Sequence, residues 1–236
     1  GQVNEGFENL LFGYTTLANP DLDPESSASI EGGLRMRDVM FGGGVWSGSL
    51  AVYKGDYEDF ISNQVVGGTG APGDPLQFQY INLTEVEISG VELEARGFWD
   101  NGFGVRFAAS RTEGDVIGTP DTPLQSVDPA QIVAGVSYDD PSGRFGGQLI
   151  STWNDAKEAG DVADASLFRS NSIITVDATA YYSLTDQITI RAGAFNLSDE
   201  KYWYWSDVRG VSATSASLDA YTQPGRNFSI SLSFRN

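Results

Sequence analysis

The sequence contains no histidine and no cysteine among its 236 residues. Without imidazole or thiol groups the chain has no Ser-His-Asp or Cys-His nucleophile, no disulfide and no zinc site of the usual His/Cys type. Basic residues are also scarce, since 14 Lys and Arg stand against 32 Asp and Glu, for a formal net charge of -18. Binding to a nucleic acid backbone depends on clustered Lys and Arg. We therefore expect no nucleic acid partner.

Long apolar runs are missing as well, because no window approaches the ~18 uninterrupted apolar residues of a membrane-spanning helix. Glycine is abundant, with 28 residues, and aromatic residues make up 12% of the chain. This composition is typical of β-structure with tight turns. If the chain lies in a membrane, we expect it to lie there as part of a barrel.

Apolar and polar residues alternate along many segments, which places successive side chains on opposite faces of a strand. In 227–234, for example, Phe228, Ile230 and Leu232 alternate with serines. We expect these even-numbered residues to face lipid. The parity of the apolar residues changes within 85–99, which predicts a bulge or a kink near Ser89 and Gly90. The alternation predicts about nine strands, over 29–37, 48–61, 85–99, 103–113, 131–138, 144–154, 174–182, 188–194 and 227–234.

The connections between these strands alternate strictly between short and long. The short ones are turn-rich and the long ones are rich in Gly, Pro, Asp and Ser. Short periplasmic turns and longer extracellular loops are typical of a transmembrane β-barrel. Bacterial single-chain barrels have an even number of strands and must close, so the odd count predicts an all-β antiparallel sheet that is a piece of a larger barrel. The predicted long connections are 63–84, 114–130, 155–172 and 198–225.

Four short motifs resemble those of TonB-dependent outer-membrane receptors, in the order of that family. They resemble its Asn-Pro-Asn-Leu-x-Pro-Glu box, its Gly-Val-Glu strand, its Asn-Leu-Phe-Asp-x-x-Tyr segment and the Pro-Gly-Arg-x-Phe entry into its last strand. The motifs are Asn19-Pro20-Asp21-Leu22-Asp23-Pro24-Glu25, Gly90-Val91-Glu92-Leu93-Glu94, Asn196-Leu197-Ser198-Asp199-Glu200-Lys201-Tyr202 and Pro224-Gly225-Arg226-Asn227-Phe228.

The resemblance implies a location in the outer membrane of a Gram-negative bacterium, in contact with its lipid. It implies a barrel of about 22 strands, of which residues 1–236 supply the last nine. A plug domain and the earlier strands would lie outside this chain, and the TonB complex would act through that N-terminal part to energise transport.

The segments 202–210 and 219–226 more particularly resemble the haem and haemoglobin receptor branch of the family. That resemblance implies haem or a haemoprotein as a partner and haem as a transported ligand, with no covalently bound cofactor. Many members of the branch place a His ligand near the Asn-Pro box, whereas this chain has no His. Tyr14, just upstream of the box, is a candidate phenolate ligand. A loop-packing role for Tyr14 is the alternative.

The loop 198–225 contains the candidate ligand contacts. Aromatic side chains in exposed loops stack on flat ligands such as porphyrin, and a guanidinium group binds a propionate. The alternative is that the tryptophans belong to the aromatic girdle at the membrane interface. The candidates are Trp203, Trp205, Asp207, Arg209 and Tyr221.

Other charged residues favour plainer interpretations. Acidic runs such as 158–164 lack a spaced calcium-loop motif, so the sequence predicts no metal site. Paired carboxylates on one strand face suit a polar lumen, and we assign no catalytic residue and expect no enzyme. Four strand arginines are expected to line the lumen in pairs with carboxylates such as Asp177: Arg35, Arg37, Arg106 and Arg191.

The sequence therefore favours a transport receptor for haem or haemoprotein-derived iron. A receptor of the same fold for ferric siderophores, cobalamin or glycans is the alternative within the family. A passive porin or a barrel adhesin is the alternative from a different class.

Overall fold

The computed structural model describes residues 7–9, 14–71, 73–118, 120–162 and 164–235, which build one 12-stranded sheet. Its strand pairs are antiparallel, apart from the parallel pairing of β2 with β5. The strands are β1 (Phe7–Asn9), β2 (Tyr14–Leu17), β3 (Ser26–Phe41), β4 (Gly44–Gly67), β5 (Leu76–Trp99), β6 (Phe103–Val116), β7 (Thr122–Pro123), β8 (Gln131–Asp139), β9 (Phe145–Asn154), β10 (Ile173–Ser183), β11 (Ile188–Phe195) and β12 (Asn227–Phe234). The helices are η1 (Ala159–Asp161), α1 (Trp205–Val208) and η2 (Leu218–Tyr221).

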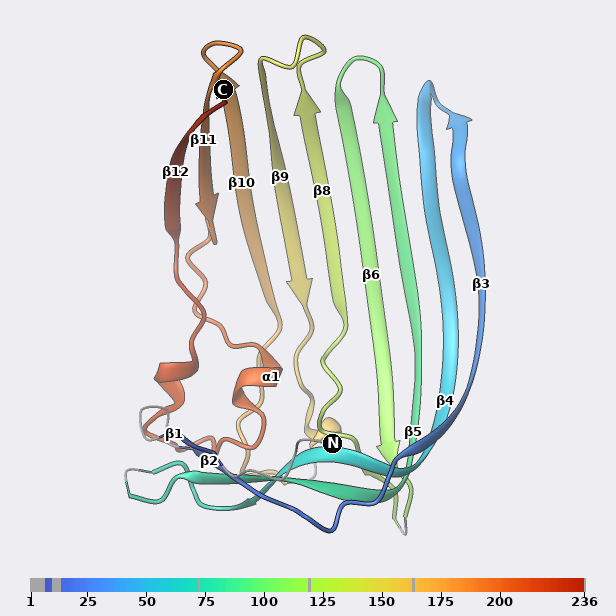
Figure 1. The fold of residues 1–236 in the computed structure, drawn as a ribbon, viewed down its shortest axis with the longest axis vertical. Helices are drawn as coiled ribbons and strands as arrows, with labels where there is room; N and C mark the ends of the chain where they lie inside the picture. Colours follow the sequence, from blue (N-terminus) through green and yellow to red (C-terminus); the bar gives the residue numbers. More distant parts are fainter. Residues whose placement is uncertain (1–6, 10–13, 72, 119, 163, 236) are drawn as a thin grey trace.

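Nine long strands follow one another across the sheet, as Figure 1 shows. They are β3 to β6 and β8 to β12, and each covers one of the nine predicted segments, which confirms the all-β prediction. The pairings of the described residues leave β3 with β4 alone and β12 with β11 alone, so the sheet is open along both sides. Within the same residues, no helix is both long enough and apolar enough to span a bilayer.

One face of the sheet is apolar across all nine long strands, because the register brings apolar residues of neighbouring strands together. Leu50 pairs with Leu93, and Ile190 pairs with Leu232. These side chains are open to the surroundings, with Ile230 79% exposed. The predicted lipid-facing residues of the last strands share this apolar face. The opposite face, called the polar face below, carries the alternate residues.

The prediction of a long connection over 63–84 is wrong. β4 runs on to Gly67 and β5 begins at Leu76, and their pairing continues as far as Gly67 with Gln77. Figure 1 shows the lower ends of β4 and β5 bending and running on beneath α1. Only residues 68–75 form the tip of this hairpin. Residues 67–75 are rich in Gly, Pro and Asp, which favoured a loop over the whole segment although Leu76, Phe78 and Tyr80 alternate with Gln77 and Gln79.

The predicted bulge near Ser89 and Gly90 is also wrong, since the register of β5 with β4 and β6 continues through both residues. Gly90 instead leaves room for the ring of Tyr53, whose hydroxyl lies 2.8 Å from the Thr112 hydroxyl. The apolar parity changes because Val86 is fully buried on the polar face. Register shifts lie elsewhere, between Met36 and Val39 of β3 and between Val65 and Gly67 of β4.

The expected pairing of lumen arginines with Asp177 does not occur. The Asp177 carboxylate accepts a hydrogen bond of 2.8 Å from the backbone N–H of Asn196. Arg191 donates a hydrogen bond of 2.9 Å to the Ser233 hydroxyl. A carboxylate next to a chain turn thus satisfies a backbone donor rather than a guanidinium group.

Candidate ligand-binding site

The long loops gather at the lower end of the sheet in Figure 1, opposite the short turns. Backbone hydrogen bonds join the loops 155–172 and 198–225, from Phe168 N to Val211 O at 2.8 Å and from Ala213 N to Ser166 O at 2.9 Å. The Ser217 hydroxyl donates to Gly70 O at the tip of the β4–β5 hairpin, at 3.2 Å. We call residues 68–75, 117–130, 155–172 and 198–225 together the loop assembly.

Trp205 lies at the centre of the loop assembly and is only 2% exposed. It packs with Val162 and Val208, and its indole N–H donates to Gln125 O at 2.6 Å. The ammonium group of Lys157 lies 5.2 Å from the centre of the ring. The prediction of a ligand contact and the girdle interpretation both require an open ring, so neither fits this position. Trp205 stabilises the packing of three loops.

Trp203 is half-buried against the same cluster. Its indole N–H donates to Leu218 O at 2.9 Å, and its ring lies 5.1 Å from that of Phe168. The ammonium group of Lys201 lies 5.4 Å above the ring and also pairs with Asp219 at 2.7 Å. Trp203 therefore contributes mainly to the internal packing of the loop.

The other predicted contacts lie around this core. Tyr14 packs edge-on against Phe78, with ring centres 6.2 Å apart. Burial is the main cause that raises the pKa of Tyr221, and the electrostatic effect of Tyr14 raises it further. Asp207 is exposed and accepts a hydrogen bond of 2.7 Å from Gln223.

Two charged residues that the sequence did not single out, Asp128 and Lys157, join Arg209 beside Trp205. Lys157 is 6% exposed and donates to Val127 O at 2.7 Å, and its burial lowers its pKa. Burial likewise lowers the pKa of Arg209, against the opposing effect of Asp128. Burial raises the pKa of Asp128, against the effect of Lys157. The sequence did contain one indication that Lys157 is unusual, because it is the only basic residue between Arg144 and Arg169.

A cavity of about 240 Å³ opens between the loops beside Trp203. Its lining includes Asp128, Asn171 and Ser206, and therefore residues from three loops. Pockets for drug-sized molecules usually measure about 300–1,000 Å³. The cavity is thus small for a porphyrin, and two further cavities of the loop assembly, of about 340 and 320 Å³, lie at the lower end of that range.

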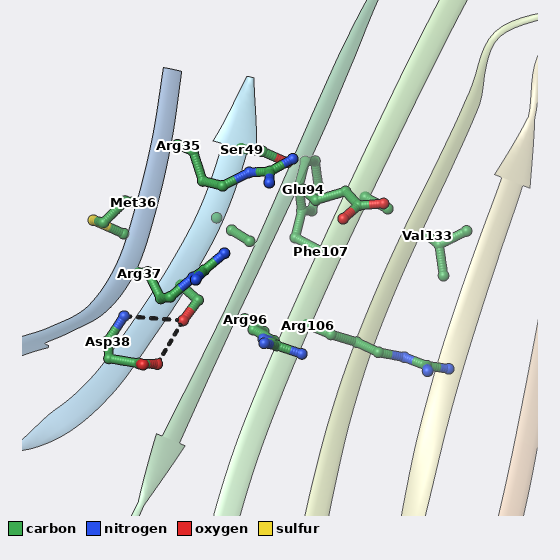
Figure 2. Close-up of a pocket in the computed structure, with 14 residues that line it drawn as sticks. Arg35, Met36, Arg37, Asp38, Ser49, Glu94, Arg96, Arg106, Phe107 and Val133 are labelled. Carbon is green, nitrogen blue, oxygen red and sulfur yellow. Dashed lines mark hydrogen bonds between the residues drawn. The ribbon is translucent and has the colours of Figure 1, made fainter. Parts of the chain in front are cut away.

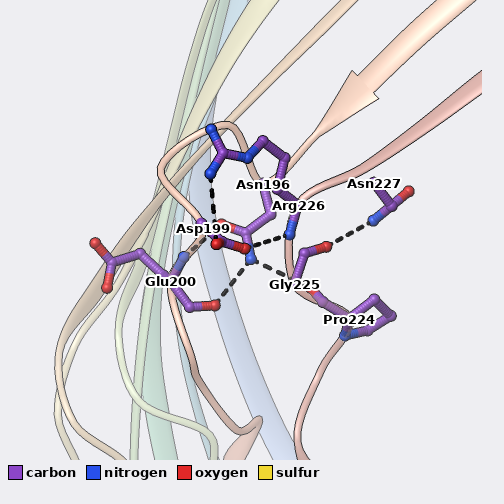
Figure 3. A network of polar contacts seen from close by, with 7 residues as sticks. All are labelled: Asn196, Asp199, Glu200, Pro224, Gly225, Arg226 and Asn227. Carbon is purple, nitrogen blue, oxygen red and sulfur yellow. Dashed lines mark hydrogen bonds and ion pairs between the residues drawn. The ribbon is translucent and has the colours of Figure 1, made fainter.

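The residues of the last two motifs meet at the base of the loop 198–225, as Figure 3 shows. Asn196 is 4% exposed and adopts a positive φ of 48°. Its amide group donates to Glu200 O at 2.8 Å and to Pro224 O at 3.2 Å, and accepts from Glu200 N at 2.9 Å. Arg226 closes the same base, since its backbone N–H donates to Asp199 at 2.8 Å and its guanidinium group pairs with that carboxylate at 3.4 Å.

The Asn-Pro box has a similar architectural role. The amide of Asn19 donates to Tyr80 O at 2.8 Å, and the Glu25 carboxylate accepts from Ile61 N at 2.9 Å. Asn82 of β5 donates to Asp23 O at 3.0 Å. The box therefore fixes the entry of β3 against the outer ends of β4 and β5.

Comparisons with known proteins agree with this architecture. Residues 1–197 match the family model described as TonB dependent receptor-like, beta-barrel. The chain is 26% identical to a probable hemoglobin and hemoglobin-haptoglobin-binding protein 4 of Haemophilus influenzae, over 92% of this chain and 25% of that protein. It is 28% identical to transferrin-binding protein A of Neisseria meningitidis serogroup B, over 91% of this chain and 27% of that protein. The chain thus spans about a quarter of the length of these relatives.

Solved structures share the fold at lower identity. The copper transporter OprC matches with a TM-score of 0.70 at 18% identity, over 91% of this chain and 32% of that chain. A ferric enterobactin receptor of Pseudomonas aeruginosa matches with a TM-score of 0.62 at 18% identity, over 93% of this chain and 32% of that chain. The chain belongs to the β-barrel family of TonB-dependent receptors, which are outer-membrane β-barrels of Gram-negative bacteria.

Proposed function

We propose that this chain is the C-terminal barrel portion of an outer-membrane receptor that takes up iron from haem or a haemoprotein. The apolar face contacts lipid, and the polar face lines the lumen of the completed barrel. The TonB complex energises transport through the plug domain, which lies outside residues 1–236. The loop assembly is the part of this chain that meets the ligand.

The loop assembly is the observation that carries this proposal. Its loops are packed against one another around Trp205, with cavities of about 240 to 340 Å³ between them. Loops that are already packed lose less conformational entropy when they bind a folded partner, so this arrangement suits a protein ligand. The named relatives that bind haemoglobin or transferrin support a protein ligand independently. Both arguments favour a haemoprotein over free haem.

The receptor in full length, expressed in a TonB-competent strain without other haem receptors, tests the proposal. We expect growth on haemoglobin as the sole iron source, and loss of that growth when tonB is deleted. Growth on ferric siderophore but not on haemoglobin or haem would refute the proposed cargo. Growth on haemoglobin that is independent of TonB would refute active transport and favour a passive pore.

A matched pair of tyrosines tests the role of the loop assembly. Tyr204, 42% exposed, lies in the loop assembly, whereas Tyr182, 45% exposed, lies at the opposite end of the sheet. Exposed tyrosines are frequent energetic centres of protein interfaces. We expect Tyr204→Ala to weaken haemoglobin binding about tenfold and Tyr182→Ala to leave it unchanged at equal surface abundance. Equal binding by the two variants would remove this surface from the interface.

A further inference from the structure

Four arginines on the polar face surround one hollow near the short turns, at the end of the sheet opposite the loop assembly. Arg35 and Arg37 lie on β3, Arg96 on β5 and Arg106 on β6, as Figure 2 shows. The hollow has a volume of about 600 Å³. We call these four residues the arginine cluster. They are four of the 14 basic residues in the sequence, whose formal net charge is -18.

The arginine cluster holds more positive charge than its surroundings neutralise. Arg96 and Arg106 are direct cross-strand partners, and like charges in that arrangement are destabilising. Within the part of the chain that the structure describes, none of the four guanidinium groups has an ion pair or a side-chain hydrogen bond. Only Glu94 and Asp38 bring carboxylates to the lining, and Asp38 already accepts a hydrogen bond from Ser47 at 3.1 Å.

Small residues give the guanidinium groups their positions. Arg106 lies across β8 at Gly135, where a Cβ atom would come within 2.9 Å of its Nε. Ser47 and Ser49 of β4 leave the space between β3 and β5 open. Since neighbouring strands lie about 4.8 Å apart, the cluster spans about 14 Å from β3 to β6. The geometry therefore presents several separate donor groups toward one space.

We propose that the arginine cluster is a binding site for a small polyanion that carries at least two carboxylate or phosphate groups. Guanidinium groups bind both kinds of group through paired, charge-assisted hydrogen bonds. The volume of the hollow lies within the usual range for small-molecule sites, about 300–1,000 Å³. Binding relieves the repulsion between Arg96 and Arg106, which no carboxylate of the described chain relieves. The site does not depend on the identity of the cargo proposed above.

Calorimetry on the purified full-length receptor tests the proposal, with citrate as the carboxylate probe and pyrophosphate as the phosphate probe. We expect saturable binding of at least one probe, and the tighter probe identifies the ligand class. Arg96→Gln and Arg106→Gln should each weaken that binding about tenfold or more. Arg191→Gln is the matched control, because Arg191 lies on the same face but outside the cluster and bonds to Ser233. Its affinity should stay within about twofold of wild type.

Labelling of the wild-type receptor with phenylglyoxal, which modifies arginine, tests the site without a variant. The bound anion should protect Arg96 and Arg106 from modification, and Arg191 should react equally with and without the anion. Absence of binding by both probes would refute the proposal, as would equal losses in the cluster and control variants. An acidic polypeptide segment that already covers the cluster would appear as low labelling without any anion, together with no binding, and would also refute it.

Discussion

Asn196 provides the sharpest test of how the loop assembly is held on the sheet. Asn196→Asp changes one nitrogen to oxygen and preserves the side-chain shape, and aspartate also tolerates a positive φ. The substitution removes the two hydrogen bonds that Asn196 donates, to Glu200 O and Pro224 O. It keeps an acceptor for the N–H of Glu200.

The expected cost follows from the side chain at position 196, which is 4% exposed: the new carboxylate lacks the donors of the amide and faces the carbonyl oxygens of Glu200 and Pro224. A buried polar group that loses its hydrogen-bond partners costs about 1–3 kcal/mol, so we expect a cost of about 2 kcal/mol. A cost of about 2 kcal/mol raises the population of the open loop about 30-fold, since about 1.4 kcal/mol corresponds to a factor of ten. Opening should be local, because the strand pairing of β11 with β12 does not involve this side chain.

Cleavage by trypsin measures this opening, because Lys201 and Arg209 provide cleavage sites inside the loop 198–225. When opening and closing are fast, the cleavage rate follows the open population. We expect Asn196→Asp to accelerate cleavage about 30-fold, as worked out above. The matched control is Asn227→Asp, since the Asn227 amide is exposed and bonds only to Gly225 O at 2.9 Å. Equal cleavage rates for Asn196→Asp and wild type would contradict the assigned role of the network.

Three further predictions address the loop core, a strand contact and the register. Trp205→Ala should lower the free energy of unfolding by about 3–5 kcal/mol and raise the rate of hydrogen exchange in all the loops that contact Trp205. A higher exchange rate only in the loop 198–225 would contradict a shared core. Gly90→Ala should lower the free energy of unfolding by about 1–3 kcal/mol because the new methyl group displaces a tyrosine ring, whereas the methyl group of Gly32→Ala enters open space. The temperature at which heating changes the gel mobility of the receptor should fall for Gly90→Ala and stay unchanged for Gly32→Ala. Spin labels at Ile230 and Ser229 should report lipid and water respectively by collision with oxygen and a nickel chelate, and the reverse result would refute the register.

The sequence was most informative where the sheet has one apolar and one polar face. There the alternation of residues such as Phe228 and Ser229 is a local signal, so the existence of every long strand could be predicted. The outer half of the β4–β5 hairpin was taken for a loop because residues 67–75 are rich in Gly, Pro and Asp, although Leu76, Phe78 and Tyr80 alternate with Gln77 and Gln79. A change of parity was equally ambiguous. Val86 is apolar because it is buried on the polar face, and the sequence does not distinguish this from a bulge.

The candidate site was harder to predict because its contacts join distant parts of the chain. The indole of Trp205 bonds to a carbonyl group 80 residues away, at Gln125. Nothing in the residues around Trp205 indicates that partner, so an exposed aromatic cluster was the natural expectation. The motifs were recognisable from the sequence, yet their roles depend on geometry. Asn196 and Pro224 are 28 residues apart and meet only when the loop closes.

The buried position of Trp205 also changes what a loop mutation can reveal about the ligand. Ordering a loop costs about 1–2 kcal/mol of backbone entropy per residue, and in this protein the loops offset that cost by packing on one another rather than on a ligand. A surface that is already ordered loses less entropy when it binds, which suits recognition of a folded protein. A substitution at Trp205 disorders that surface without touching the ligand, whereas one at the exposed Tyr204 leaves its order intact. Loss of haemoglobin use is therefore evidence of contact only when the exchange protection of the loop assembly is unchanged.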